Sequence, residues 1–273
     1  MLEQEVKEAV YVYIESAQNS RVRAWSQLKS KKGRTRQGLF LVEGRRLIDE
    51  LFRSAYEVDA LLWNVASDEL PDELRGHPKA AGKVFELSPS AFDQVSDTTT
   101  PQGVIAVAKV PAEDTANLAS HAILLDGLQD PGNVGTLLRS AEAFDFATVC
   151  CGTNTVDPFS PKVVRATMGG MFRLQLCTDD SLPFVRKWRH QHPDGRVIVT
   201  AADADEVCYQ TDLTRPTLVV IGNEAFGIRE DVRDAADQTV SIPMSAETES
   251  LNAAVAGSVL IYEAYRQRSL RGN

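Results

Sequence analysis

The sequence lacks the features of a membrane protein and of a metal centre. No apolar run reaches the roughly 20 residues of a membrane-spanning helix. Only four cysteines are present, none in a CxxC pair and none beside a histidine at zinc-ligand spacing. Residues 1–16, MLEQEVKEAVYVYIES, carry acids where a signal peptide has a basic region and then an apolar core. We therefore expect a soluble, cytoplasmic protein with no bound metal and no membrane partner.

Three common signatures of nucleotide binding and catalysis are also missing. The chain contains no GxxxxGK[ST] phosphate-binding loop, no GxGxxG dinucleotide fingerprint and no GxSxG nucleophile elbow. These absences argue against a P-loop enzyme, a dinucleotide-binding Rossmann domain and a serine hydrolase of the common kinds.

Positive charge is scarce, but it is concentrated in one segment. The chain has 29 Lys and Arg against 38 Asp and Glu, and its net charge of −9 argues against indiscriminate nucleic-acid binding. Residues 21–36, RVRAWSQLKSKKGRTR, hold seven of the basic residues and no acid. Composition alone leaves two interpretations open, a solvated surface or a patch that contacts phosphate groups.

The hydrophobic pattern divides the chain into two α/β units. Residues 1–110 form the first, small unit, and residues 111–121, with little to bury, form the linker. Residues 122–273 alternate continuous apolar runs with helical patterns, which indicates a mainly parallel sheet whose ligands bind beyond the C-terminal strand ends. The strands predicted in this unit are 122–126, 147–151, 196–202, 217–222 and 239–243. The helices predicted there lie near 134–144, 160–168, 181–190, 228–235 and 250–267.

The first of three unusual stretches follows the predicted strand 122–126. Residues 128–144, LQDPGNVGTLLRSAEAF, contain a Pro-Gly turn, and Asn133 suits the N-cap of the next helix. Gly135 costs about 1 kcal/mol in a first helical turn relative to alanine, which indicates that another backbone or a ligand comes close there. Arg139 lies further along this helix, from which it could also simply extend into solvent.

Two other predicted strand ends are equally polar. In residues 217–228, TLVVIGNEAFGI, a predicted strand ends at Gly222, and a carboxylate, Glu224, follows two residues later. Residues 240–268 pass from a strand through a polar loop, 245–250, into a long helix whose first turns are rich in small residues. Each stretch alone fits an ordinary capped turn about as well as a ligand site.

Taken in order, the three stretches resemble the motifs of the SpoU (TrmH-type) RNA ribose 2′-O-methyltransferases of the SPOUT superfamily. The similar segments are DPGNVGTLLRSAEAF, IGNEAFGI and SIPMSAETESLNAAVAGSVLIYEA, and SPKVVRATMGGMFRL (160–174) is similar to the family's segment between the first two. IESAQNSRVRAWSQL and FLVEGRRLIDE resemble the family's N-terminal substrate-binding domain less closely. One departure is Ala225, where the family often has glycine.

The resemblance implies an α/β fold with a small N-terminal RNA-binding domain and a C-terminal SPOUT domain that contains a trefoil knot. It implies an enzyme that uses S-adenosyl-L-methionine to methylate a ribose 2′-oxygen of RNA and forms a homodimer through the C-terminal domain. The domain layout favours rRNA as substrate. A tRNA methyltransferase and a non-catalytic RNA-binding assembly factor remain the alternatives, and the modified nucleotide is not identified.

The resemblance also assigns residues by motif position. Arg139 matches the family's catalytic arginine; because a guanidinium stays protonated, we expect it to polarise the 2′-hydroxyl and hold the adjacent phosphate. The catalytic set is Arg139, Asn133, Glu224, Ser250 and Asn252. The cofactor-binding set is Gly222, Ile242 and Leu251, which match the family's cofactor-contacting positions, together with Met244 and with Thr200 at a predicted strand end. The resemblance of the first unit to the substrate-binding domain makes its basic segment a predicted RNA contact, and the RNA-binding set is Arg21, Arg23, Lys29, Lys31, Lys32, Arg34, Arg36 and Arg165.

Overall fold

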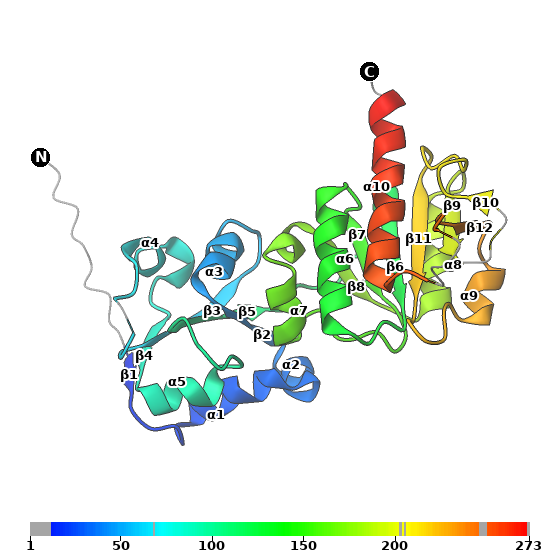
Figure 1. Cartoon of the computed structure of the whole chain (residues 1–273). Coiled ribbons are helices and arrows are strands. Elements are labelled where there is room, and N and C mark those ends of the chain that lie inside the picture. Colours follow the sequence, from blue (N-terminus) through cyan, green and yellow to red (C-terminus); the bar gives the residue numbers. More distant parts are fainter. Residues whose placement is uncertain (1–11, 68, 202–203, 205, 246–249, 272–273) are drawn as a thin grey trace, which may run out of the picture. The chain divides into compact units, whose positions relative to one another are not determined.

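The chain folds into two compact units (Figure 1). The computed structural model describes residues 12–67, 69–201, 204, 206–245 and 250–271. The first unit comprises Met1–Pro111 with Phe159–Pro161, and the second comprises Ala112–Pro158 with Lys162–Asn273. Each unit has its own sheet and its own buried apolar cluster, and the predicted α/β class is confirmed.

The first unit is built on a mixed five-stranded sheet. Its strands are β1 (Val12–Ile14), β2 (Leu39–Glu43), β3 (Val58–Asn64), β4 (Val84–Leu87) and β5 (Val104–Lys109). They lie in the order β1-β4-β3-β5-β2. The first three in this order are parallel, whereas β5 runs antiparallel to both of its neighbours.

Helices cover both faces of this sheet (Figure 1). They are α1 (Ser20–Ser26), η1 (Gln27–Lys29), α2 (Lys31–Gln37), α3 (Arg45–Phe52), α4 (Asp72–Arg75), η2 (Pro78–Ala80) and α5 (Pro89–Val95). α1 and α5 pack together and bury Trp25 and Phe92 in one cluster with Leu62 and Ile105 of the strands. α3 buries one apolar side against the other face, because its apolar residues recur at helical spacing.

The second unit is built on a seven-stranded, all-parallel sheet. Its strands are β6 (His121–Asp126), β7 (Thr148–Cys151), β8 (Gln175–Thr178), β9 (Arg196–Thr200), β10 (Glu206–Val207), β11 (Thr217–Gly222) and β12 (Gln238–Ser241). Their order is β10-β12-β9-β11-β6-β7-β8. From β6 the chain continues outward to β7 and then to β8 on one side of the sheet. On its other side β6 pairs with the later strand β11, so the direction in which the chain adds strands changes at β6.

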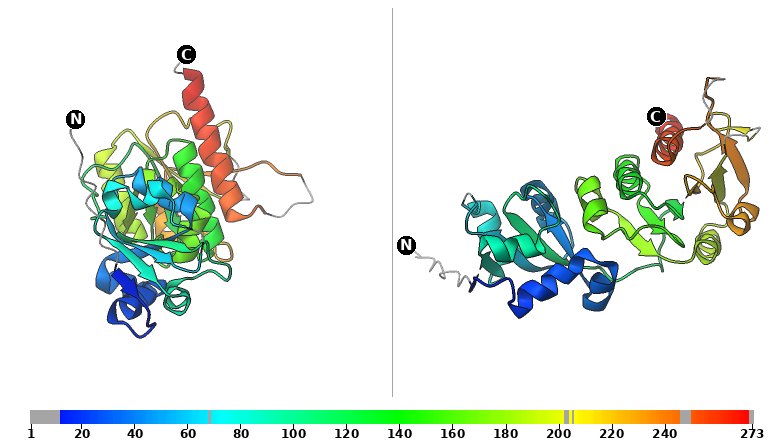
Figure 2. Two further views of the ribbon diagram at one scale, coloured as in Figure 1. Left: turned by 90° about the vertical axis from the view of Figure 1, so that its left-hand side faces the viewer. Right: turned by 60° about the horizontal axis from the view of Figure 1, so that its bottom comes forward.

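Two layers of helices enclose this sheet (Figure 2). The helices are α6 (Pro131–Ala143), α7 (Pro161–Ala166), η3 (Gly170–Arg173), α8 (Ser181–Gln191), α9 (Glu230–Asp234) and α10 (Ala253–Arg271). α8 and α9 bury Phe184, Trp188 and Val232 against one face, and α6 and α10 pack together on the other. Within the described ranges, no helix is both long enough and apolar enough to cross a membrane.

Two glycines allow the helices of the second unit to pack closely. A Cβ atom on Gly135 of α6 would lie 2.2 Å from the Cβ of Ala166, so α6 and α7 pack with almost no gap between them. A Cβ atom on Gly257 of α10 would lie 2.5 Å from Leu137 Cδ2 and 3.1 Å from Ile221 Cδ1. The prediction of close approach at Gly135 is therefore confirmed, and the small residues at the start of α10 allow a similar approach.

His121 gives the second unit a pH-dependent stability. Burial, and secondarily the Arg268 cation, lower the pKa of His121 to about 4 from the usual 6.5. Between these values the unfolded chain binds more protons than the folded chain, so the free energy of unfolding falls as pH drops from 6.5 towards 4. Because His121 is only partly buried, we expect a loss of about 1 kcal/mol between pH 7 and pH 5. Urea unfolding at pH 7 and pH 5 measures it, and His121→Gln should flatten the dependence. An equally steep dependence in His121→Gln would contradict this assignment.

Candidate functional site

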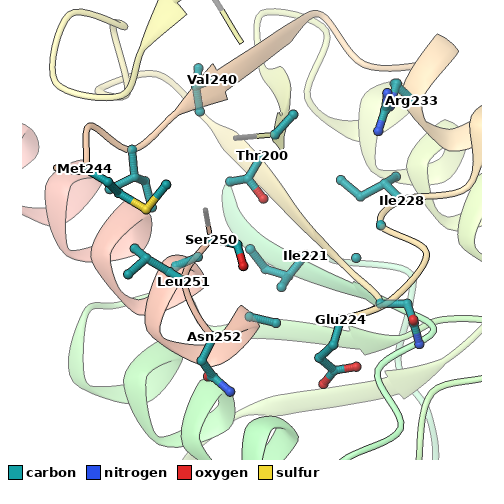
Figure 3. Close-up of a pocket in the computed structure, with 17 residues that line it drawn as sticks. Thr200, Ile221, Glu224, Ile228, Arg233, Val240, Met244, Ser250, Leu251 and Asn252 are labelled. Atoms are coloured by element: carbon teal, nitrogen blue, oxygen red, sulfur yellow. The ribbon is translucent and has the colours of Figure 1, made fainter. Parts of the chain in front are cut away.

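A pocket of about 500 Å³ lies at the C-terminal ends of β9, β11 and β12, beside the start of α10 (Figure 3). This volume is typical of small-molecule sites, which span roughly 300–1,000 Å³. The position is the one expected for a ligand site in an open parallel sheet. The lining residues are Thr200, Ala201, Ile221, Gly222, Asn223, Glu224, Gly227, Ile228, Arg233, Val240, Ile242, Met244, Ser250, Leu251, Asn252, Ala253 and Ala256.

The structure brings most of the expected site residues to this pocket. All five residues of the cofactor-binding set line it, together with three of the catalytic set: Thr200, Gly222, Ile242, Met244, Leu251, Glu224, Ser250 and Asn252. Asn133 reaches the same place through hydrogen bonds to two lining residues. The predicted polar loop 245–250 includes residues 246–249, which lie outside the described residues.

One wall of the pocket is a tight turn that follows β11. The backbone groups of Asn223 and Gly227 bond to each other in both directions, at 2.9 Å each. Asn223 Oδ1 accepts from the N–H groups of Ala225 and Phe226, at 2.9 and 3.0 Å. A Cβ atom on Gly222 would lie 2.5 Å from the Gly227 carbonyl carbon, so only glycine fits there. Ala225 is not among the residues of positive φ, and the turn therefore accommodates a side chain at this position.

Asn133 joins the three motifs in one hydrogen-bond network. Its Nδ2 donates to Glu224 Oε1 at 2.7 Å, and its Oδ1 accepts from Asn252 Nδ2 at 3.0 Å. Figure 3 shows the Glu224 and Asn252 side chains near each other at the edge of the pocket. The network unites segments 91 and 119 residues apart in sequence, and it orients the Glu224 carboxylate through a neutral partner.

The helix caps explain why Asn133 and Asn252 are available for this network. Asp130, not Asn133, is the N-cap of α6: its Oδ1 accepts from Asn133 N at 2.7 Å, and Pro131 occupies the first helical position. The expectation that Asn133 caps the helix is therefore wrong. Asn252 caps α10 with Oδ1, which accepts from Ala254 N at 2.9 Å, and this leaves Nδ2 for Asn133.

Arg139 does not join the pocket of its own chain. Six residues separate it from Asn133, which places it about 9 Å along α6 and about 240° around the helix axis. Its side chain is exposed, does not line the pocket, and makes no hydrogen bond or ion pair within the described chain. A Cβ atom on Gly170 would lie 3.5 Å from the Arg139 Cα, so η3 packs behind the backbone at this point.

The basic segment of the first unit is only partly a free surface. Arg34 is 4% exposed, and its Nη1 donates to the carbonyls of Leu28 and Lys29 at 2.8 and 3.0 Å. Arg34 therefore belongs to the fold, which corrects its assignment to the RNA-binding set. Lys29 is half-buried and donates to the Ser96 carbonyl at 2.8 Å, and Arg165 is half-buried on α7. The remaining members of the set are exposed: Arg21, Arg23, Lys31, Lys32 and Arg36.

Asp126 is a site-supporting residue that the sequence interpretation missed. Its carboxylate, at the end of β6, is 1% exposed. One oxygen accepts from the Ser181 hydroxyl, and the other accepts from Arg229 N at 3.0 Å. The Asp231 and Asp180 carboxylates raise the pKa of Arg229 above its usual range. The signal in the sequence was an acid at the end of an otherwise apolar strand.

The comparisons with known proteins agree with this geometry. Residues 120–262 match the profile of the SpoU rRNA Methylase family, and residues 19–106 match the MRM3-like substrate binding domain. The chain is 32% identical over 251 residues to the 23S rRNA (guanosine(2553)-2'-O)-methyltransferase RlmP of Bacillus subtilis, covering 91% of this chain and 97% of that protein. It is 31% identical over 264 residues to the 23S rRNA (uridine(2479)-2'-O)-methyltransferase of Streptomyces viridochromogenes, covering 93% and 92%.

A solved structure extends the likeness to three dimensions. The crystal structure of the SpoU methyltransferase AviRb from Streptomyces viridochromogenes in complex with the cofactor AdoMet superposes with a TM-score of 0.84 and 31% identity. The match covers 92% of this chain and 98% of that chain. Both units of this chain therefore have counterparts in the AviRb structure.

Proposed function

The chain belongs to the SpoU rRNA methylase family, and on that premise we propose that it transfers a methyl group from S-adenosyl-L-methionine to the 2′-oxygen of a ribose in ribosomal RNA. The meeting of Asn133, Glu224 and Asn252 beside a pocket of small-molecule size carries this proposal. The two named relatives are 2′-O-methyltransferases of 23S rRNA, which favours rRNA over tRNA. Methyl transfer to unmodified rRNA, mapped to the nucleotide, is the test.

The pocket fits S-adenosyl-L-methionine in size and in chemistry. When bound, this molecule supplies a methyl group activated by its sulfonium. Ile242, Met244 and Leu251 offer an apolar wall for its adenine. Gly222 leaves the backbone at the end of β11 open for hydrogen bonding, and Thr200 adds a hydroxyl at the end of β9. These five residues form the proposed cofactor site.

The proposed catalytic groups align the ribose and stabilise the loss of its proton. The network holds the Glu224 carboxylate and the Asn133 amide in fixed positions, so that little reorganisation is needed when the substrate binds. Ser250 and Asn252 complete the polar wall. Arg139 polarises the 2′-hydroxyl and holds the adjacent phosphate, a task for which a planar fork of donors is suited.

Because Arg139 stands outside the pocket of its own chain, we propose that it acts on the pocket of a second copy in a homodimer. α10 exposes Val255, Val259 and Tyr262 at helical spacing, with 48%, 38% and 49% of each residue exposed. Such a stripe is typical of a helix that packs against a partner. α6 lies beside α10, to which Ser140 is joined by a 2.8 Å hydrogen bond with Ser258. An interface over this helix pair would include the exposed Arg139.

Family membership supports three finer features of this proposal. They are a trefoil knot in the second unit, a cytoplasmic location, and a division into an RNA-binding domain, 1–110, a linker, 111–121, and a methyltransferase domain, 122–273. The match of residues 19–106 to a substrate binding domain favours RNA contact by the first unit.

The proposed RNA surface of the first unit consists of Arg21, Arg23, Lys31, Lys32 and Arg36, which are exposed on α1 and α2. Replacing Arg23, Lys31 and Lys32 together by glutamine should weaken RNA binding. The slope of the logarithm of the RNA association constant against the logarithm of the salt concentration should become shallower by about 2–3. Each lost phosphate contact accounts for roughly 0.7–0.9 of this slope. Filter binding of rRNA between 50 and 200 mM salt measures this.

A matched control isolates this surface from the overall charge of the unit. Arg53 is an exposed cation at the end of α3 in the same unit, and Arg53→Gln should leave the salt slope unchanged. An unchanged slope in the triple variant would remove α1 and α2 from the RNA interface.

A further inference from the structure

Phe226 has an apolar side chain that is almost completely exposed to solvent. It is 89% exposed, more than any other large apolar residue among those the structure describes. A phenylalanine ring buried in a protein gains favourable transfer energy that this ring forgoes. The exposed apolar residues of α10 form a helical stripe, whereas Phe226 stands on a turn between β11 and α9. The exposure of Phe226 is therefore not explained by the proposed α10 interface, and it indicates a separate binding partner for this ring.

The turn that carries Phe226 holds the backbone in one conformation. Phe226 N donates to Asn223 Oδ1 at 3.0 Å, and the paired backbone bonds between Asn223 and Gly227 close the turn. Gly227 adopts φ 68°, a left-handed conformation that favours glycine and reverses the chain tightly. The ring is thus attached to a closed turn rather than to an open loop.

Both ends of the turn are also tied to the end of β6. Asn223 Nδ2 donates to the Gly127 carbonyl at 2.7 Å, and Arg229 N donates to the buried Asp126 carboxylate at 3.0 Å. The residues that follow Gly127 lead directly into the α6 segment that contains Asn133. The turn that carries Phe226 is therefore anchored by direct hydrogen bonds to the end of β6, a short way before Asn133 in the chain.

Phe226 also lies close in the chain to the residues at which the proposed function places the substrate ribose. It is two residues from Glu224, within one tight turn, and Glu224 bonds to Asn133. When the 2′-oxygen of a ribose reaches this network, the base of that nucleotide and the bases of the adjacent nucleotides lie close to the same turn. Proteins that read unpaired RNA stack such bases on aromatic side chains.

We propose that Phe226 is a positioning residue that stacks on a nucleobase of the RNA, that of the methylated nucleotide or of its neighbour, and so holds the ribose over the pocket. This inference rests on the proposed function. Stacking accounts for a single exposed ring on a polar turn, whereas an apolar protein contact would call for further exposed apolar residues on the same turn, and Asn223–Gly227 contain no other large one.

The test compares Phe226→Ala with Phe226→Trp on unmodified rRNA transcribed in vitro. Phe226→Ala should lower kcat/KM for RNA by about 10- to 100-fold, the loss expected for one base–aromatic stack, mainly through KM. Its affinity for S-adenosyl-L-methionine, measured by calorimetry, should stay within about twofold of wild type. Phe226→Trp should retain activity, and RNA binding should quench the added tryptophan fluorescence. Tyr209→Ala, at a 57% exposed aromatic residue elsewhere in the unit, is the control and should change nothing.

Three results would overturn the inference: an unchanged kcat/KM in Phe226→Ala, a shift of that variant to monomers in sedimentation, or no quenching in Phe226→Trp. Failure of the proposed function is a separate result, in which the wild-type protein transfers no methyl group to rRNA. The fluorescence of Phe226→Trp then still reports whether RNA covers this turn.

Discussion

Replacing Arg139 by alanine is expected to lower the rate of methyl transfer by about 10²–10³-fold, the usual effect of removing one positioned donor from a reacting centre. Because Arg139 does not line the pocket, binding of S-adenosyl-L-methionine should stay at the wild-type level in calorimetry. Arg139→Lys keeps the charge but loses the planar fork, so only part of the rate should return. Loss of cofactor binding in Arg139→Ala would contradict the role assigned to this residue.

A mixed-dimer experiment tests whether Arg139 acts across the interface. Arg139→Ala and Glu224→Ala should each have little activity alone. After unfolding and refolding at equal amounts, half of the dimers contain one copy of each variant. If Arg139 serves the partner's pocket, one of the two sites in such a dimer is intact, and about a quarter of the wild-type activity returns. No recovery, with mixed dimers demonstrated by differential tags, would place Arg139 at the pocket of its own chain.

Replacing Gly222 by alanine is expected to weaken cofactor binding strongly. The added methyl carbon would lie 2.5 Å from the Gly227 carbonyl carbon and 2.6 Å from the Ile228 nitrogen. Both are backbone atoms of the closed turn, and they cannot move aside as the end of a flexible side chain can. The turn must open, and with it a wall of the pocket. Calorimetry with S-adenosyl-L-methionine should show an affinity at least about 30-fold weaker, equivalent to roughly 2 kcal/mol.

The control for this variant lies in the same turn. Ala225→Gly removes a methyl group at an exposed position whose φ is not positive, and it restores the residue common in the resembling motif. Its cofactor affinity should stay close to wild type. Wild-type affinity in Gly222→Ala would show that this turn is not part of the cofactor site.

Much of the second unit could be predicted from local pattern. The runs 122–126, 147–151 and 217–222 became β6, β7 and β11, because buried parallel strands are continuous apolar segments. β8, Gln175–Thr178, was missed because an edge strand of four residues with polar ends has no distinctive pattern. Strand order was also out of reach, since it depends on pairing between distant segments.

Several residues that meet at the pocket could be named from the sequence, but their contacts could not. The motifs named Asn133, Glu224 and Asn252, yet only the fold shows that the Asn133 amide links the other two. Arg34 was misassigned because charge patterning does not reveal that two backbone carbonyls bind its guanidinium in the interior. The separation of Arg139 from its own pocket follows from helix geometry, because a spacing of six residues points two side chains to different sides.

Methyl transfer to defined RNA tests the central claim most directly. The protein would be incubated with labelled S-adenosyl-L-methionine and, separately, with unmodified rRNA and tRNA, and the label mapped by nuclease digestion and mass spectrometry. The account predicts one 2′-O-methylated nucleotide in rRNA and none in tRNA. Label only in tRNA, label on a base atom, or no label on naked rRNA and ribosomal particles despite intact cofactor binding would contradict it.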